Sequence, residues 1–133
     1  MAAALRLIGD AGLPTVDLPD IRGLRLWVLE AGVSVLGVIA MERFGTHALL
    51  RSLAIAPEHR RRGFARDLVA RLEHDARAEG VQRLTLLTET AQDFFGRLGY
   101  CPIDRREAPP DVQQSAEFRS LCPVTAICMT KSL

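Results

Sequence analysis

The first half of the chain alternates apolar and polar residues with the period of two that β-strands show. Three such segments follow one another, at residues 24–30, 33–41 and 48–56, and only short turns separate them. Turns this short join antiparallel neighbours, because a parallel neighbour needs a long crossover. The pattern therefore predicts a three-stranded antiparallel meander, closed by Pro57.

A helical period of 3.6 residues replaces this alternation after Gly63, and Gly80 marks the end of the helix. Its apolar stripe consists of Ala65, Leu68, Val69, Leu72 and Ala76. A shorter helix is predicted ahead of the meander, at residues 2–11, followed by a turn-rich segment at 14–20.

Shorter elements follow the long helix. They are a strand at 83–88, a short helix at 90–98 whose Thr90 and Asp93 fit a capping box, a strand at 100–103, a helical stretch at 110–118 and a strand at 123–130. This order predicts an α+β (mixed α/β) fold with a central, mixed, mostly antiparallel sheet flanked by helices. Because no linker interrupts it, residues 1–133 are expected to form a single domain.

Composition narrows the classes of function. Of the 133 residues, 48% are hydrophobic, and 17 basic residues against 16 acidic ones give a net charge of +1. Nucleic-acid binding through bulk charge needs a surplus of clustered cations, so no nucleic-acid partner is expected. No segment reaches the roughly 20 apolar residues of a membrane helix, and the first residues lack the basic start of a signal peptide. We expect a cytoplasmic protein without a membrane partner.

The sequence contains no metal-binding pattern. The residues considered are His47, His59 and His74, which lack ligand spacing, and Cys101, Cys122 and Cys128, which form no CxxC pair. Cys101 and Cys128 are interpreted as small core residues. The alternative is a soft-metal site formed by Cys122 and Cys128 across a turn. No metal cofactor is expected.

The segment from Leu53 to Arg66 (LAIAPEHRRRGFAR) predicts an anion site. The free N–H groups of a helix's first turn, together with the helix dipole, favour a phosphate or pyrophosphate. Gly63 and Ala65 leave room for close approach, and the nearby arginines add positive charge. An ordinary, solvated connection between strand and helix would carry the same charges, so the spacing decides between the two interpretations.

The spacing Arg60-x-x-Gly63-x-Ala65 resembles the acetyl-CoA motif (Q/R-x-x-G-x-G/A) of the GCN5-related N-acetyltransferase (GNAT) superfamily. A second segment, A-x-x-F-F-x-R-x-G-Y from Ala91 to Tyr100, resembles another conserved part of that family. The resemblance implies a GNAT-like fold whose sheet splays apart, at a β-bulge, between the parallel strands 48–56 and 83–88. It also implies acetyl-CoA as co-substrate.

The resemblance further implies which residues contact acetyl-CoA. The backbone of residues 53–55 would bind the pantetheine arm, and the amides of residues 61–66 would bind the pyrophosphate. The expected cofactor-binding residues are Leu53, Ala54, Ile55, Arg60, Arg61, Arg62, Gly63, Phe64, Ala65, Arg66, Thr88, Phe94, Phe95 and Arg97.

Acetyl transfer to an amine requires a neutral amine, a donor for the developing oxyanion and a thiolate that leaves. A backbone N–H of the third strand is the expected oxyanion donor. Many relatives place a tyrosine as general acid where this sequence has Phe95, which has no proton to donate, and Tyr100 is interpreted mainly as a core residue. Glu42 is the expected catalytic base, against the alternative of a solvated charge at a strand end. Glu89 is a weaker candidate.

Arg51 lies on a central apolar strand, where an unpaired guanidinium is costly. Strict alternation would place it on the same face as Leu53 and Ile55. Two interpretations stay open: a clamp for a substrate carboxylate, which suits the two-pronged guanidinium, or a structural ion pair with Glu42 or Asp93.

Three segments, at residues 50–57, 94–100 and 117–129, resemble small acetyltransferases associated with bacterial arsenic-resistance operons. This resemblance implies a small amino-acid-like amine as acceptor, extending to an organoarsenical or phosphinate amino acid, with direct attack in a ternary complex and Arg51 holding the carboxylate. Relatives usually open with a strand before the first helix, whereas this sequence begins within that helix.

The leading prediction is an acetyl-CoA-dependent N-acetyltransferase acting on a small amine. Two alternatives stay open: a protein or peptide N-acetyltransferase, and a non-catalytic CoA-binding regulatory module. A homodimer that pairs through an exposed edge of the C-terminal strand is also expected.

Overall fold

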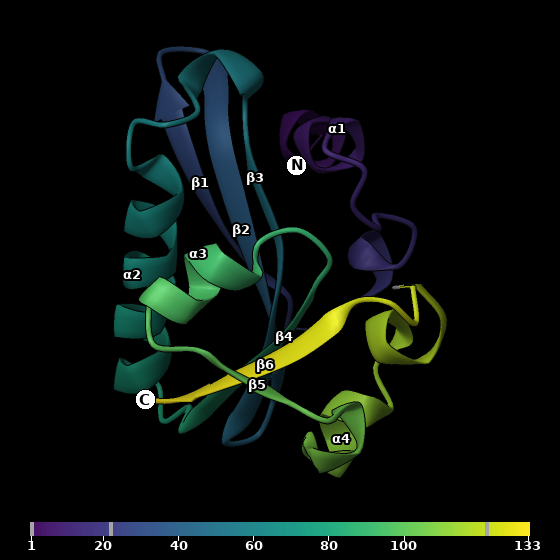
Figure 1. The fold of residues 1–133 in the computed structure, drawn as a ribbon. Coiled ribbons are helices and arrows are strands. Elements are labelled where there is room, and N and C mark those ends of the chain that lie inside the picture. The colour runs from purple at the N-terminus through teal and green to yellow at the C-terminus, as the bar shows by residue number, and fades with distance from the viewer. Residues whose placement is uncertain (1, 22, 122) are drawn as a thin grey trace.

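A six-stranded sheet with helices on both faces organises the chain (Figure 1). The computed structural model describes residues 2–21, 23–121 and 123–133. The strands are β1 (Arg25–Ala31), β2 (Ser34–Phe44), β3 (His47–Ile55), β4 (Arg83–Thr88), β5 (Cys101–Ile103) and β6 (Ile127–Ser132). Across the sheet they run in the order β1-β2-β3-β4-β6-β5, with β3 and β4 parallel and the other neighbours antiparallel. The expected mixed, mostly antiparallel sheet is confirmed.

Helices cover both faces of this sheet (Figure 1). The helices are α1 (Ala2–Asp10), α2 (Phe64–Ala78), α3 (Gln92–Arg97) and α4 (Pro110–Gln113). Short turns complete the chain: η1 (Leu18–Asp20), η2 (Pro57–His59), η3 (Arg105–Glu107) and the π-helical turn η4 (Glu117–Leu121). The helices α2 and α3 lie on one face of the sheet, and α1 and α4 lie on the other.

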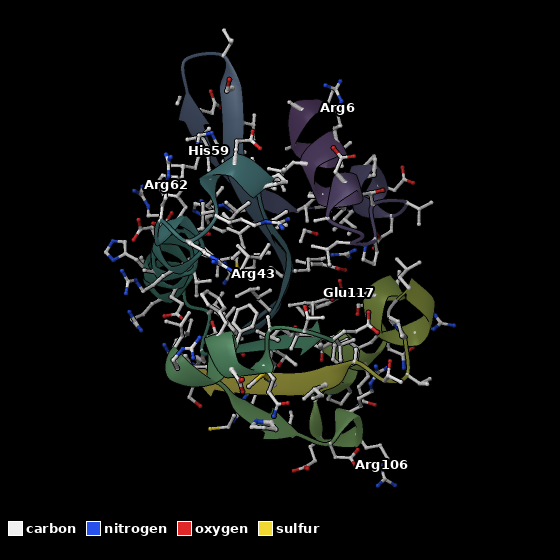
Figure 2. All side chains as sticks on the ribbon, turned by 45° about the horizontal axis from the view of Figure 1, so that its top comes forward. Arg6, Arg43, His59, Arg62, Arg106 and Glu117 are labelled. Atoms are coloured by element: carbon white, nitrogen blue, oxygen red, sulfur yellow. The ribbon has the colours of Figure 1, made fainter. Side chains whose placement is uncertain are left out.

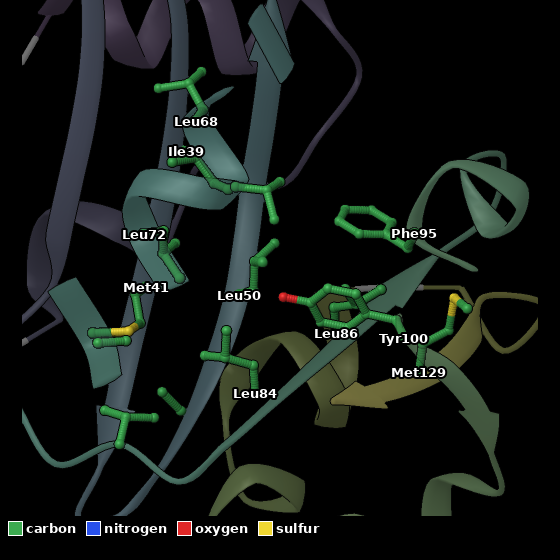
Figure 3. Close-up of a cluster of buried hydrophobic side chains, with 14 of the residues drawn as sticks. Ile39, Met41, Leu50, Leu68, Leu72, Leu84, Leu86, Phe95, Tyr100 and Met129 are labelled. Atoms are coloured by element: carbon green, nitrogen blue, oxygen red, sulfur yellow. The ribbon is translucent and has the colours of Figure 1, made fainter. Parts of the chain in front are cut away.

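The larger core lies between the sheet and α2 (Figure 3). The predicted apolar stripe of α2 is confirmed, because Leu68, Val69, Leu72 and Ala76 are all buried. Each buried leucine contributes roughly 2 kcal/mol of transfer free energy. Gly37 of β2 allows the close approach of this helix, since a Cβ there would lie 2.7 Å from Ile55 Cδ1 and 3.1 Å from Leu68 Cδ1. A smaller core beneath α1 contains Ala4 and Ile8.

The expected β-bulge lies in the second half of β3. The pair Val38–Ala54 is followed by the pair Ala40–Arg51, so one residue of β2 faces two residues of β3. The first of these two, Ser52, has a φ of 63°, a left-handed conformation that is uncommon for a residue with a side chain. The bulge therefore changes the direction of the strand and the faces of its side chains.

This bulge makes the alternation expected for Arg51 wrong. Leu50, Leu53 and Ile55 all pack into the core on the α2 side. Arg51 instead turns to the opposite face, where it meets Asp17. An extra residue in a strand shifts every later side chain to the other face, which strict alternation cannot reproduce.

The two parallel strands separate soon after they begin. β3 and β4 pair only through His47–Arg83, Ala48–Leu84 and Leu49–Thr85 within the described residues, although β3 continues to Ile55 and β4 to Thr88. Beyond Leu49 the backbone of β3 has no partner strand on its β4 side. The expected splay between two parallel strands is confirmed.

Two local expectations are wrong, and a third is not tested. Thr90 and Asp93 do not cap α3: its N-cap is Ala91, which has no side-chain cap, and the Ala91 N–H instead donates to Thr88 Oγ1 at 3.0 Å. Cys101 is exposed rather than in the core, whereas Cys128 is buried, and burial raises the pKa of the Cys128 thiol to about 11. Cys122, and with it the proposed pairing with Cys128, lies outside the described residues.

The C-terminal part also departs from the prediction. The helical stretch is shorter than 110–118 and gives way to the π-helical turn η4, and β6 starts at Ile127 rather than at 123. β6 lies between β4 and β5, so it has a partner on both sides. Dimerisation through a free edge of the C-terminal strand is therefore excluded as a route, because this strand is not at the edge of the sheet.

Candidate active site

A cleft opens where β3 leaves β4, between the end of β3, the start of α2 and the helix α3. Its volume is about 840 Å³. We call it the α2 cleft, and its lining residues are Ala11, Leu53, Ala54, Ile55, His59, Arg60, Arg61, Gly63, Phe64, Ala65, Arg66, Ala91, Phe94, Arg97 and Leu98. These come from segments far apart in the chain, yet most belong to the single stretch from 53 to 66.

The start of α2 gives this cleft unpaired backbone donors. Gly63 is the N-cap, with a φ of 81°, and no side chain caps the helix. Arg61 has a φ of 66°, so the loop before the helix curls tightly. The first N–H groups of a 15-residue helix with no capping side chain point out of its end, where the helix dipole is also positive. This end suits a phosphate.

The charge of the α2 cleft is positive. Among its described lining residues are four arginines and no carboxylate. Arg60 is held in place because its Nε donates to the Ile55 carbonyl at 3.2 Å. Arg66 lies against the loop, since a Cβ on Gly63 would lie 3.3 Å from Arg66 Nη2. A pyrophosphate group and an extended apolar arm both fit this combination of donors, cations and open strand edge.

The structure brings most of the predicted cofactor residues to this cleft and leaves three out. Arg62 extends outward from the loop (Figure 2), and its Nη1 lies 3.4 Å from His59 Nδ1. Thr88 lines a different cavity. Phe95 is buried in the core, where its ring is edge-on to that of Phe94. It is also edge-on to Tyr100 (Figure 3).

Four lining residues were not predicted: Ala11, His59, Ala91 and Leu98. His59 falls within the predicted loop and could have been included from its position alone. Ala11 could not, because it comes from the far end of α1.

A second cavity, of about 590 Å³, lies along the end of β4. We call it the β4 pocket. Its lining residues are Ala11, Gly12, Leu13, Pro14, Thr15, Val16, Leu87, Thr88, Glu89, Thr90, Leu121, Pro123 and Ala126. Ala11 lines both cavities, so the α2 cleft and the β4 pocket adjoin at the end of α1.

Arg51 lies between three carboxylates on the face of the sheet opposite α2. Its Nη1 and Nη2 donate to the two oxygens of Asp17 at 2.7 and 2.9 Å, and Nη1 also lies 3.4 Å from Glu42 Oε1. Its Nε lies 3.5 Å from Glu117 Oε1, and Figure 2 shows Glu117 near the helical segment that carries it. The Arg51 side chain is 0% exposed. We call these four residues the Arg51 cluster.

One of the two predicted pairings of Arg51 is present and the other is absent. Glu42 is a partner, as expected for an ion pair. Asp93 lines a separate, smaller hollow with Arg97 and Tyr100 and forms no described ion pair with Arg51. Asp17 and Glu117 were not predicted as partners. The costly burial of Arg51 was a sequence signal that carboxylates must surround it, but it did not say which ones.

The Arg51 cluster contains an excess of negative charge. Burial raises the pKa of Glu42, and the nearby charge of Asp17 adds to the rise, although Arg51 opposes it. Burial acts to lower the pKa of Arg51, but the hydrogen bond that Arg51 donates to Asp17 and the charges of the surrounding carboxylates raise it overall. Arg51 therefore stays charged, and the pKa of Glu42 is shifted toward holding a proton.

Glu42 lies beside the last residues through which β3 and β4 pair, just before the two strands separate. We call this point the closed end of the splay. Glu42 pairs with Leu49 across β2 and β3, and Leu49 belongs to the last paired position of β3 and β4. Two buried hydroxyls flank this point, those of Ser52 and Thr85, and neither has a hydrogen-bond partner among the described residues. Neither was predicted, and no sequence signal marks them, because the bulge that places Ser52 is a feature of the backbone.

Tyr100 belongs to the core, as interpreted from the sequence. Its hydroxyl donates to Glu73 Oε2 at 2.7 Å, and Lys131 Nζ also contacts Glu73, at 3.0 Å. Burial and the hydrogen bond with Glu73 raise the pKa of Tyr100 well above its ordinary value. A hydroxyl held this way points at α2 rather than into the α2 cleft.

Residues 2–21, 23–121 and 123–133 contain neither a metal site nor a membrane-crossing helix. No group of three or more histidine, cysteine or acidic side chains there could hold a metal ion. None of the helices in the same part of the chain combines the length and the apolar composition needed to cross a membrane.

Solved structures share this fold. N-acetylglutamate synthase from Neisseria gonorrhoeae, complexed with coenzyme A and N-acetyl-glutamate, matches 99% of this chain with a TM-score of 0.80 at 20% identity. This chain covers 32% of that synthase chain, or about a third of its length. A Mycobacterium tuberculosis protein in complex with CoA and NLQ matches 99% of this chain and 93% of its own, with a TM-score of 0.78 at 22% identity.

A third similar structure is Tetrahymena GCN5, which matches 98% of this chain and 84% of its own with a TM-score of 0.78 at 13% identity. At these identities the three structures show that this chain shares their fold. The acetyltransferase (GNAT) domain family matches residues 22–102, and the chain belongs to this family. Coenzyme A is bound in two of these similar structures, which fits acetyl-CoA as the co-substrate. No curated protein sequence gives a significant match.

Proposed function

We propose that residues 1–133 form one catalytic domain that transfers an acetyl group from acetyl-CoA to the primary amine of a small molecule. One observation carries the proposal: the α2 cleft and the β4 pocket adjoin where β3 and β4 separate. The α2 cleft supplies helix N–H groups and arginines for a pyrophosphate. The β4 pocket, of about 590 Å³, has the size of a small-molecule site.

In this proposal acetyl-CoA supplies a thioester whose thiolate leaves readily. The acceptor arrives as an ammonium ion, with a pKa of about 10.4, and must lose one proton before its nitrogen can attack. The new N–C bond forms as the C–S bond breaks, and the second nitrogen proton is released to the departing sulfur. The chain has to position the two reactants, accept the first proton and stabilise the oxyanion.

Glu42 is the proposed proton acceptor. It lies at the closed end of the splay, and burial raises its pKa, which brings a carboxylate closer to the working pH of a general base. The unpaired backbone edge of β3 at Leu53 and Ala54 is the proposed source of the oxyanion donor. The α2 cleft contains no tyrosine, so the sulfur takes its proton from the amine or from solvent.

An amino-acid-sized acceptor is supported by two facts. The β4 pocket is smaller than the α2 cleft, and the similar synthase from Neisseria gonorrhoeae was crystallised with N-acetyl-glutamate. The arsenical and phosphinate amino acids implied by the tail segment fall in the same size range. They therefore belong in any panel of acceptors.

For Arg51 we propose a positioning role rather than a substrate clamp. Its guanidinium is fully buried and already bonded to both oxygens of Asp17. To bond Arg51, a substrate carboxylate would have to displace Asp17. If Asp17 stayed, the substrate would be a fourth negative group around one cation. Held by Asp17 and Glu117, Arg51 instead fastens the segments 11–17 and 117–121, which border the β4 pocket, to the sheet.

The test is acetyl-CoA-dependent thiol release against alkylamines, amino acids, arsenical and phosphinate analogues, polyamines and basic peptides, with acetyl-CoA binding measured by calorimetry. Turnover of one small-molecule class supports the proposal. Turnover of peptides alone would assign the chain to protein acetylation. Acetyl-CoA binding without any turnover would assign it to a CoA-binding regulatory module.

A further inference from the structure

The β4 pocket differs in chemistry from the α2 cleft. Its lining is mostly apolar, with Leu13, Pro14, Val16, Leu87, Leu121, Pro123 and Ala126. Its one charged lining residue among the described residues is Glu89, and no arginine or lysine is among them. Electrostatics at this pocket therefore favours a cation and opposes a carboxylate.

One exposed valine belongs to this apolar lining, and a second follows a lining residue in the sequence. Val16, which lines the pocket, is 75% exposed, and Val124, between lining residues Pro123 and Ala126, is 91% exposed. These are two of the four exposed large hydrophobic residues among the described part of the chain. A mostly apolar lining that includes an exposed large hydrophobic residue is typical of a site that receives an apolar ligand.

Glu89 is placed to receive an ammonium group. It directly follows Thr88, the last residue of β4, and so lies at the open end of the splay. Its Oε1 accepts a hydrogen bond from Thr125 Oγ1 at 3.1 Å, which links it to the segment bearing Val124 and leaves the carboxylate free to accept further bonds. Thr88 is less available, because its Oγ1 already accepts the Ala91 N–H.

The cations near this pocket do not compensate. Arg105 is not among the lining residues, and its Nη2 already donates to the carbonyls of the lining residues Pro123 and Ala126. Arg51 faces Asp17, which follows the lining residue Val16, but its side chain is 0% exposed and is enclosed by three carboxylates. An α-carboxylate entering the β4 pocket would meet Glu89 and the excess negative charge of the Arg51 cluster. It would lose its hydration without gaining an ionic partner.

We propose that the acceptor is an amine on an apolar body with no carboxylate beside the amine, and that Glu89 binds its ammonium on entry to the β4 pocket. This inference rests on the proposed function and specifies its substrate class. Glu89 acts in specificity, whereas Glu42 remains the proposed proton acceptor.

Matched acceptors test the proposal. Isopentylamine and phenethylamine are leucine and phenylalanine without their carboxylates, and leucinamide keeps the leucine skeleton and masks the carboxylate. We expect kcat/KM to be at least about tenfold higher for both amines and for leucinamide than for leucine, a modest discrimination by the standards of enzyme pockets. Isopentylamine is more basic than leucine and leucinamide is less basic, so a gain for both acceptors cannot come from amine basicity.

A variant tests the role of Glu89. Glu89→Gln should raise KM for isopentylamine several-fold with kcat little changed, and should reduce the preference over leucine. Calorimetry of isopentylamine binding to the enzyme–CoA complex should show the same loss without relying on turnover. The matched control is Glu30→Gln, an exposed carboxylate next to the β1–β2 turn, which should change neither quantity.

The outcomes separate this inference from the proposed function. Faster turnover of leucine than of leucinamide would overturn the inference and leave the acetyltransferase proposal standing. An unchanged KM in Glu89→Gln would overturn the role of Glu89. Acetyl-CoA binding with no turnover of any acceptor would overturn the proposed function and the inference together.

Discussion

The two cavities that adjoin at the splay are built by different means. The α2 cleft is formed largely by backbone: an open strand edge, the left-handed residues Arg61 and Gly63, and the free end of α2. The β4 pocket depends on side chains, because the Arg51 cluster joins segments that are distant in sequence. A backbone site can keep its geometry when surface side chains vary, whereas the β4 pocket should be sensitive to single charges.

The largest expected effect is on the α2 cleft. Gly63→Glu should abolish measurable acetyl-CoA binding, a loss beyond about 1000-fold or about 4 kcal/mol, because it adds a negative side chain at a φ of 81° beside the helix end. Calorimetry measures the affinity, and circular dichroism checks the fold. Gly45→Glu is the matched control, since Gly45 also has a positive φ, of 66°, but lies in the β2–β3 turn.

Unchanged affinity in Gly63→Glu would contradict the assignment of the phosphate-binding end. It would also remove the contrast between the two cavities, because the α2 cleft would no longer be the one defined by backbone donors.

The next effect concerns the Arg51 cluster. Arg51→Ala leaves three carboxylates without their cation, and breaking such a buried pair costs about 3–5 kcal/mol of unfolding free energy. That is a large share of the roughly 5–15 kcal/mol that stabilises a typical domain. Urea unfolding measures it. Arg43→Ala, which removes an exposed ion pair with Glu79, should cost less than about 1 kcal/mol.

Arg51→Lys distinguishes positioning from substrate binding. Lysine retains the charge but cannot bond both oxygens of Asp17 at once. A folded Arg51→Lys variant with normal acetyl-CoA affinity and an acceptor KM raised equally for isopentylamine and leucine would support positioning. A KM raised for leucine alone would support a carboxylate clamp.

Glu42→Gln should lower kcat by about 100-fold or more, within the range typical of a lost general base, while acetyl-CoA affinity stays the same. The pH dependence of kcat gives an independent readout. Because burial raises the pKa of Glu42, the acidic limb of the profile should lie above the ordinary value of about 4.3 and disappear in the variant. An intact limb in Glu42→Gln would assign the base to another group.

The raised pKa of Glu42 also predicts a smaller effect, on the unfolding free energy of the protein. A carboxyl whose pKa is raised by folding favours the folded state below its unfolded pKa, and this contribution is lost as the pH rises through the folded value. The unfolding free energy should therefore fall less between pH 4 and pH 8 in Glu42→Gln than in the parent. Parallel curves would show that Glu42 is not shifted.

The two cavities also differ in how far the sequence predicted them. The α2 cleft follows from a contiguous motif, because Arg60, Gly63 and Ala65 are fixed relative to one another by a loop and one helical turn. The β4 pocket brings together residues near 15, 88 and 123, and no local spacing marks them. Sheet class and strand order in the meander were predicted because they rest on local patterns. The splay was predicted only from the resemblance to the GNAT superfamily.

The errors have a physical origin in features that local patterns do not express. The bulge at Ser52 reverses the face of Arg51, and so the partners Asp17 and Glu117 were missed. The insertion of β6 between β4 and β5 is a matter of long-range pairing, which no periodicity shows. Thr88 was assigned to acetyl-CoA from the family resemblance, but it lines the β4 pocket, and its hydroxyl accepts the Ala91 N–H.

The smallest expected effect concerns Tyr100, which tests whether any acid from the α2 side takes part in the reaction. Tyr100→Phe removes the hydrogen bond to Glu73, but Lys131 still pairs with that carboxylate, so the loss in unfolding free energy should be about 1 kcal/mol. The ring keeps its edge-on contact with Phe95. Because the hydroxyl points at α2, kcat and its basic limb should not change. A kcat lowered more than about tenfold would place the acid on the same side of the sheet as acetyl-CoA. It would then be wrong that backbone groups form the cofactor cleft and that side chains form only the acceptor pocket.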